Sequence, residues 1–218
     1  MRKHLILVEG IADLVFIKDF IEVHYGHTYR DSVKIHDKTT EIIVIHDNGN
    51  YIKIFVLRSK DALENENTLK RIKSDINKEN YHNSILILDA DENFGNSKEK
   101  AEKDKANLGL TNFYLFPNNE EVGDLETILE NIQVDKNIAN CWSKFEVCIN
   151  ESGEKYTIPA KKSKIHTYLE VLNPNTNKGK DNCKERNRNY KENAIWTLSD
   201  LTNPYILKLK NFLDQYLN

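Results

Sequence analysis

Short apolar runs alternate along the first half of the chain with longer segments of helical periodicity. Six stretches rich in apolar and β-branched residues predict strands at 5–8, 33–36, 42–45, 52–57, 85–88 and 113–116. Seven segments predict helices at 13–25, 61–78, 95–108, 124–132, 137–148, 163–172 and 205–217. Strands that alternate with helices indicate the α/β class, and runs as apolar as 5–8 and 85–88 are typical of a mainly parallel sheet flanked by helices.

Two polar segments predict turns or loops. Asp47-Asn48-Gly49-Asn50 contains an Asn-Gly pair of the kind that forms sharp turns, and residues 173–179 read as a loop. The 218 residues then divide into an α/β core at 1–135 and a mainly helical C-terminal extension at 136–218, which we expect to pack on the core.

Composition limits the class of protein. Hydrophobic residues make up 39% of the chain and charged residues 30%, as in soluble globular proteins. The three cysteines have neither the even count nor the spacing of a disulfide framework or a zinc site. No apolar run has the length of a signal peptide or a membrane span, so we expect a cytoplasmic protein without membrane association.

Charge is distributed unevenly along the chain. Residues 160–191 hold nine Lys or Arg against three acids, a local balance of +6, so the remainder carries −9 of the formal net charge of −3. An acidic part that holds cations and a basic segment that holds phosphates would suit a metal-dependent enzyme acting on a polyanion. The alternative is that these basic side chains form a solvated surface.

Carboxylates follow two of the most apolar predicted strands. Glu9 and Asp13 come directly after residues 4–8, and Asp89 and Asp91 come after 84–88. In open α/β sheets ligands bind beyond the carboxyl ends of the strands, where these residues would emerge. Unpaired carboxylates near a core are costly, and hard oxygen donors favour Mg²⁺ or Mn²⁺, so we expect a metal site at this edge.

The same residues also have structural interpretations. An acid in a first helical turn, such as Asp13, often only caps the helix or interacts with its dipole. An isolated Asp-x-Asp occurs in unrelated enzymes and by chance. The order of the two motifs along the chain is more informative than either motif alone.

With these motifs the chain resembles the toprim domain, the metal-binding catalytic domain of topoisomerases, bacterial primases and several nucleases. The resemblance covers about residues 4–130. It includes Glu9-Gly10 after the first strand, Asp13 in the next helix, Asp47-Asn48-Gly49 at a glycine turn, and Asp89-Ala90-Asp91. It implies a Rossmann-like toprim core.

A second motif narrows the resemblance. Phe116-Pro117-Asn118-Asn119 followed by Gly123-Asp124-Leu125-Glu126 is similar to a stand-alone bacterial toprim-related family of unknown function, itself similar to the overcoming-lysogenization-defect nucleases. In those nucleases a further acid holds a second metal, which implies that role for Glu126, with Asp124 behind it. The alternative is that Asp124 is an N-cap with Glu126 in the first helical turn.

The resemblance also implies roles for the other residues. Glu9 would act as general acid or base or as a metal ligand, and Asp89 as the ligand shared by two ions. Asp13 and Asp91 would complete the first ion's ligands. A lysine would stabilise the transition state; Lys161, Lys162 and Lys164 are available, and we take Lys164 as the candidate. The alternative is that these lysines are simply solvated.

The resulting hypothesis is Mg²⁺- or Mn²⁺-dependent hydrolysis of phosphodiester bonds in DNA or RNA, with a role in phage defence in a bacterium. A partner ATPase and a homo-oligomer are compatible with it. The chain has no Gly-x-x-x-x-Gly-Lys loop, zinc module or recognisable topoisomerase tyrosine, which argues against primase and topoisomerase. Two alternatives remain open, a non-catalytic module that binds nucleic acid or nucleotide within a defence complex, and a structural cation site.

Overall fold

The computed structural model describes residues 2–35, 39–45, 49–57, 59, 61–153, 155–172 and 181–217, with the backbone alone for 30–35 and 39–45. Residues 47 and 48 of the predicted glycine turn and the predicted loop at 173–179 lie outside these ranges.

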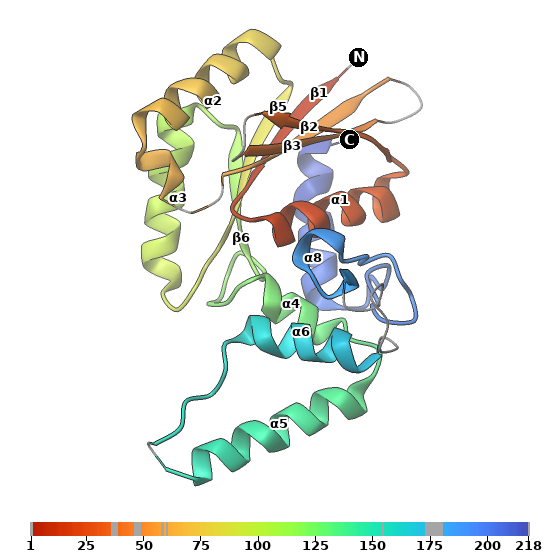
Figure 1. The fold of residues 1–218 in the computed structure, drawn as a ribbon. Coiled ribbons are helices and arrows are strands. Elements are labelled where there is room, and N and C mark those ends of the chain that lie inside the picture. Colours follow the sequence, from red (N-terminus) through yellow and green to blue (C-terminus); the bar gives the residue numbers. More distant parts are fainter. Residues whose placement is uncertain are drawn as a thin grey trace.

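The fold is a Rossmann-like α/β arrangement around one six-stranded sheet (Figure 1). Its strands are β1 (Lys3–Val8), β2 (Thr28–Ile35), β3 (Thr39–Ile45), β4 (Tyr51–Val56), β5 (Asn83–Asp89) and β6 (Asn112–Phe116). In the spatial order β2-β3-β4-β1-β5-β6, the last four strands are parallel, while β3 is antiparallel to both of its neighbours. The prediction of a mainly parallel sheet is confirmed.

Helices cover both faces of the sheet (Figure 1). The α-helices are α1 (Ile11–Tyr25), α2 (Glu66–Glu79), α3 (Phe94–Leu108), α4 (Leu125–Asn131), α5 (Lys136–Glu151), α6 (Lys161–Leu172) and α8 (Pro204–Leu217), with short 3₁₀ turns η1 (Ala62–Glu64) and η2 (Glu185–Asn187). Helices α1 and α8 lie on one face and α2 and α3 on the other, while α4, α6 and α5 follow one another away from the carboxyl ends of the parallel strands.

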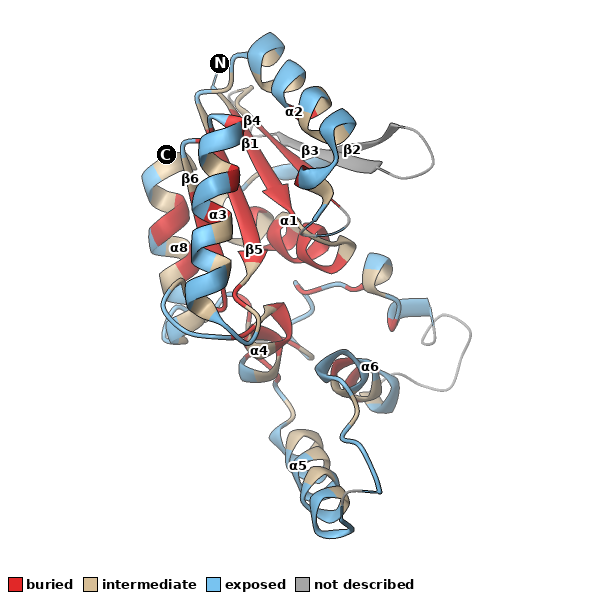
Figure 2. Cartoon of the chain, turned by 90° about the vertical axis from the view of Figure 1, so that its left-hand side faces the viewer, coloured by how far each residue is buried: buried red, intermediate tan, exposed pale blue. Residues whose placement is uncertain are grey.

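The alternation of side chains along each strand divides the core between the two faces. Ile6 and Val8 of β1 join the cluster built on α1, α4, α6 and α8, whereas Leu5 and Leu7 join the cluster under α2 and α3. Because both faces are covered, the central strands are almost continuously apolar and buried, as Figure 2 shows.

The predicted single helix at 61–78 is wrong in its first part. The structure has the 3₁₀ turn η1, then a break at Asn65, and only then α2. The side chain of Asn65 accepts hydrogen bonds from the N–H groups of Asn67 and Thr68, which makes it the N-cap of α2. A capping amide competes with helix continuation, and the apolar spacing alone did not reveal it.

The C-terminal part contributes to the larger core cluster. The buried residues of that cluster include Ile165 and Leu169 of α6, Trp196 in the segment before α8, and Leu209 of α8. None of the side chains of α5 is buried (Figure 2). The structure describes all three cysteines, and none of them forms a disulfide. Within the part of the chain that the structure describes, none of the helices combines the length and the apolar character that a membrane span requires.

His4 at the start of β1 links stability to pH. The side chain is 3% exposed, and its ring lies edge-on to that of His82, with 5.8 Å between the ring centroids. Burial, followed by the positive charges of His82 and Arg2, lowers the pKa of His4 to about 4.

We predict that His4 destabilises the fold in acid. His4 binds a proton near pH 6.5 in the unfolded protein but only near pH 4 in the folded protein. The free energy of unfolding therefore decreases as the pH falls through that window, by up to roughly 3 kcal/mol. Urea unfolding measures the free energy of unfolding of His4→Phe and of the wild type. Between pH 6.5 and 4 this free energy should fall less in the variant than in the wild type. The exposed His166→Phe on α6 is the control and should lose as much stability as the wild type, and equal losses in all three proteins would contradict the prediction.

Candidate metal and phosphate site

Strand pairing brings two of the predicted carboxylates to one edge of the sheet. β1 and β5 are adjacent and parallel, with Val8 paired to Ile87, so Glu9 and Asp89 emerge together at their carboxyl ends. After β1 the chain first forms the strands on one flank of β1, of which β4 is its neighbour. It later crosses to β5, the neighbour of β1 on the other flank. This is the type of position at which open α/β sheets bind ligands.

Asp13 lies in the first turn of α1, directly after this edge. Its Oδ2 accepts a hydrogen bond of 2.7 Å from the N–H of Gly10, the N-cap residue. The side chain is 7% exposed. The capping interpretation of Asp13 is therefore confirmed, and the hydrogen bond holds the carboxylate against the residue that follows Glu9.

Asp91 is held by its backbone. Its φ of 52° is left-handed, and its N–H and C=O exchange hydrogen bonds of 2.8 and 2.9 Å with Gly123. Gly123 has a φ of 142°, and a Cβ there would come within 3.0 Å of Thr127 and Pro117. The bridge ties the Asp89-Ala90-Asp91 segment to the loop that leads into α4.

Helix α4 presents its N-terminus to the same edge. The N–H of Leu125 donates to Oδ1 of Asp89 at 3.1 Å. Asp124 is the N-cap, because its Oδ1 accepts from the N–H of Thr127 at 2.9 Å and from its hydroxyl at 2.7 Å. The N-cap interpretation of Asp124, with Glu126 in the first turn, is confirmed.

Mutual repulsion shows that these carboxylates share one environment. Burial, followed by the charges of Asp13 and Glu9, raises the pKa of Asp89 to about 9. Glu126 and Asp124 act on it in the same direction. Burial also raises the pKa of Asp13 to about 7, against its helix-cap hydrogen bond, with Glu9 and Glu126 adding to the rise. Like charges that are partly shielded from water favour protonation in this way.

Glu126 is the most deeply buried of the group, with 3% exposure. Its Oε1 is buried and has no hydrogen-bond partner among the described residues. Burial raises the pKa of Glu126, while the positive charges of Lys162 and Arg188 partly offset the rise. A buried carboxylate oxygen without a donor is costly and is a natural ligand position for a cation.

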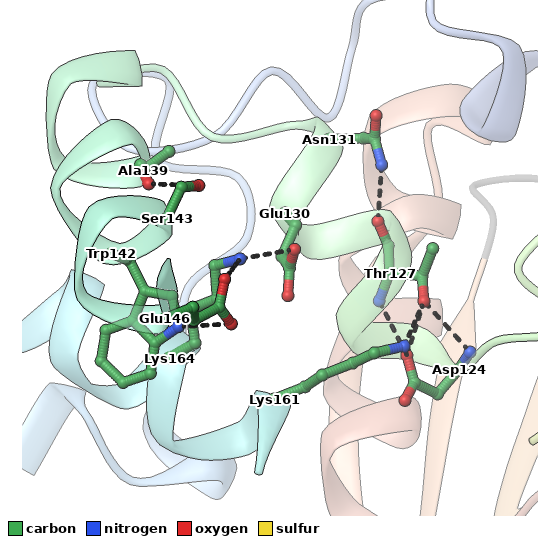
Figure 3. Close-up of polar contacts among 10 residues, drawn as sticks. All are labelled: Asp124, Thr127, Glu130, Asn131, Ala139, Trp142, Ser143, Glu146, Lys161 and Lys164. Carbon is green, nitrogen blue, oxygen red and sulfur yellow. Dashed lines mark hydrogen bonds and ion pairs between the residues drawn. The ribbon is translucent and has the colours of Figure 1, made fainter. Parts of the chain in front are cut away.

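Three lysines at the start of α6 lie at different distances from this group. Nζ of Lys161 donates to Oδ1 of Asp124 at 3.1 Å and to Oγ1 of Thr127 at 3.0 Å. Nζ of Lys164 instead lies 2.9 Å from Glu130, away from Asp124, as Figure 3 shows.

Lys162 interacts with the carboxylate group through its charge. Burial lowers its pKa, but the nearby acids, of which Glu126 has the largest effect and Asp13 and Asp89 act in the same direction, raise it above the usual value. Its Nζ also lies 3.8 Å from Oε1 of Glu185, so Lys162 interacts both with that glutamate and, through its charge, with the carboxylate group.

The donor set suits Mg²⁺ or Mn²⁺ because every candidate ligand atom is a carboxylate oxygen. Hydrogen bonds occupy one oxygen each of Asp13, Asp89 and Asp124. Among the residues that the structure describes, no three His, Cys, Asp or Glu side chains are gathered closely enough to form a ready-made cage. Mg²⁺ does not require one, since it keeps several waters and often uses one or two carboxylates.

The structure thus brings Glu9, Asp13, Asp89, Asp124 and Glu126 into one electrostatic group, with Asp91 tethered beside it by its backbone. It does not bring Lys164 to that group. In the sequence, Lys162 is one of the three available lysines, whereas Arg188 is only a member of the basic segment. The choice among the three lysines depends on the direction in which α6 approaches α4, for which the local sequence contains no signal.

Comparison with known proteins adds a family and a distant fold neighbour. Residues 3–218 match the family model described as "Protein of unknown function (DUF3226)". A search of curated proteins found no match. The crystal structure of a hypothetical protein from Pyrococcus horikoshii OT3 aligns with 99% of this chain and 95% of its own, at 16% identity and a TM-score of 0.48.

We predict that Asp89 destabilises the metal-free protein at high pH. Its folded pKa of about 9 lies above the unfolded value of 3.8, so the folded state binds the extra proton and stability falls as the pH rises from 4 to 9. At pH 8, Asp89→Asn should unfold at a higher urea concentration than the wild type. Its free energy of unfolding should be larger by on the order of 1–3 kcal/mol.

The Oδ1 of the asparagine can still accept the hydrogen bond from the N–H of Leu125. The variant therefore differs from the wild type mainly in the charge of this side chain. The exposed Glu99→Gln on α3 is the control and should unfold like the wild type. A stability gain in Asp89→Asn that is the same at pH 5 and pH 8 would contradict the electrostatic explanation.

Proposed function

The chain belongs to the family described as Protein of unknown function (DUF3226), and we propose that it hydrolyses phosphodiester bonds of nucleic acid with Mg²⁺ or Mn²⁺ at a toprim-type carboxylate site. The observation that carries the proposal is the convergence of Glu9, Asp13, Asp89 and Glu126 from three distant segments on one edge of the sheet. A protein that needed only stability would not gather four partly desolvated acids there.

The side chains have distinct tasks in this proposal. Asp89, at the centre of the group, is the shared ligand, and Asp13 and Asp91 complete one ligand set. Glu126, with its buried free oxygen, anchors the second set, with Asp124 behind it. Glu9 is the general acid or base or a further ligand. When bound, the ions would activate water and neutralise charge on the phosphate and the leaving oxygen.

The fold itself holds these groups in place. The Gly10 N–H orients Asp13, and the Leu125 N–H orients Asp89 at the N-terminus of α4. Lys161 neutralises Asp124 and keeps the cap of α4 beside the site. Lys162, rather than Lys164, is the lysine that we now expect to face developing negative charge during cleavage.

A second function remains a candidate because of a specific observation. No three acidic, His or Cys side chains in the described ranges form a closed metal cage. A module that binds nucleic acid or nucleotide without cleaving it, within a defence complex, would need no such cage. Either function is compatible with a cytoplasmic phage-defence role, a partner ATPase and a homo-oligomer.

Metal-dependent cleavage tests the proposal. Plasmid DNA, linear DNA and structured RNA incubated with Mg²⁺ or Mn²⁺ should be cut, and Glu9→Gln and Asp89→Asn should each lower the rate by about 100-fold or more. Glu99→Gln should cut like the wild type. Binding without cleavage by any metal would favour the module, and cleavage that persists in Asp89→Asn would reveal a contaminating nuclease.

The lysine variants test the geometry of the basic side. Lys162→Met should lower the cleavage rate by about 10- to 100-fold, because it removes a positive charge that acts on the carboxylates. Lys164→Met is the matched control on the same helix and should change the rate by less than about threefold, since its ammonium pairs with Glu130. A larger effect of Lys164→Met would restore Lys164 to the role predicted from the sequence.

A further inference from the structure

A buried arginine lies beside the carboxylate group. Arg188 follows the 3₁₀ turn η2 and is 6% exposed. Its Nη1 donates to the hydroxyl of Tyr190 at 3.4 Å, while its Nε is buried and has no acceptor among the described residues. Arg188 forms no ion pair with a carboxylate in the part of the chain that the structure describes.

The surroundings of Arg188 are rigid. Tyr190 is fully buried, its N–H donates to Oδ2 of Asp19 at 2.7 Å, and its ring packs edge-on against Phe16 of α1. The backbone of Arg188 is held by its own N–H, which donates to the carbonyl of Glu185. The hydrogen bond to Tyr190 thus positions one terminal nitrogen of the guanidinium, and the bond to Glu185 positions the backbone of Arg188.

Its position relates it to the proposed active site. The charge of Arg188 acts on Glu126, and the hydroxyl of Tyr190, its hydrogen-bond partner, senses the charges of Glu126 and Asp13. Two buried groups of opposite charge, Arg188 and Glu126, thus interact through their charges, and each has one polar atom without a hydrogen-bond partner among the described residues.

Such an arrangement is costly for stability alone. A buried guanidinium loses hydration, and a carboxylate that makes no hydrogen bond to it does not replace the hydrogen bonds that water provided. The planar guanidinium is the side chain best matched to the oxygens of a phosphate, which it can bind through two parallel N–H groups. An anion between the carboxylate-bound cations and Arg188 would satisfy both sides.

We infer that Arg188 binds a backbone phosphate of the nucleic acid at the edge of the carboxylate site. The inference rests on the proposed function for the identity of the ligand. Arg188 donates from Nε and a terminal nitrogen to two oxygens of the phosphate, and Tyr190 holds the other terminal nitrogen in place.

The first test observes the atom directly. Nε–H signals of ¹⁵N-labelled protein with Mg²⁺ are recorded during titration with inorganic phosphate, and the signal missing from Arg188→Lys identifies Arg188. We expect that signal to move with saturation while the other arginine signals stay in place. A signal of Arg188 that does not move overturns the inference. This measurement uses the wild-type protein, so it does not depend on whether Arg188→Gln folds.

The second test measures binding without turnover. The protein is titrated into a fluorescent single-stranded oligonucleotide in the presence of Ca²⁺. We use Ca²⁺ in place of Mg²⁺ so that binding is measured without cleavage, because its coordination is looser than the near-octahedral geometry of Mg²⁺. Arg188→Gln should weaken binding by about 10- to 100-fold, and Arg188→Lys, which keeps the charge but loses the planar pair of donors, by about 3- to 10-fold. The exposed Arg186→Gln, two positions earlier, is the matched control and should change binding by less than about threefold.

The outcomes separate this inference from the proposed function. Carboxylate-dependent cleavage together with normal binding by Arg188→Gln overturns the inference and leaves the nuclease in place. Binding that depends on Arg188 in a protein that cuts no substrate supports the inference and overturns the nuclease. Equal weakening by Arg186→Gln and Arg188→Gln would show a diffuse charge effect and overturn the inference.

Discussion

The parallel pairing of β1 with β5 is the constraint on which the rest of the site depends. It aligns the carboxyl ends of two strands that are about 80 residues apart in the sequence, so Glu9 and Asp89 must emerge side by side. Once the strands are paired, the repulsion between their acids follows directly from the fold. The protein limits that repulsion with backbone donors from Gly10 and Leu125 and with the charge of Lys162.

Positive charge reaches the site from the last third of the chain. Lys161 and Lys162 start α6, and Arg188 follows η2, while the carboxylates belong to β1, α1, β5 and α4. The C-terminal part is therefore more than a cover for the sheet, because it supplies the cations that oppose the acidic edge. This arrangement accounts for the uneven distribution of charge along the sequence.

Much of the core could be predicted from the sequence, and the reasons are physical. Central strands of a parallel sheet are buried on both faces, so the runs at 5–8 and 85–88 are apolar without interruption. The helix predicted at 61–78 failed because the side chain of Asn65 hydrogen-bonds to the backbone that would continue the helix. Long-range contacts such as the hydrogen bond from the N–H of Tyr190 to Asp19 leave no periodic trace in the sequence.

Two backbone hydrogen bonds between Asp91 and Gly123 join the loop after β5 to the loop before α4. Because these two hydrogen bonds join the loops, any displacement of α4 would also move the segment after β5. Since the loops are already joined in the folded protein, a ligand that binds between them would pay less conformational entropy to order them.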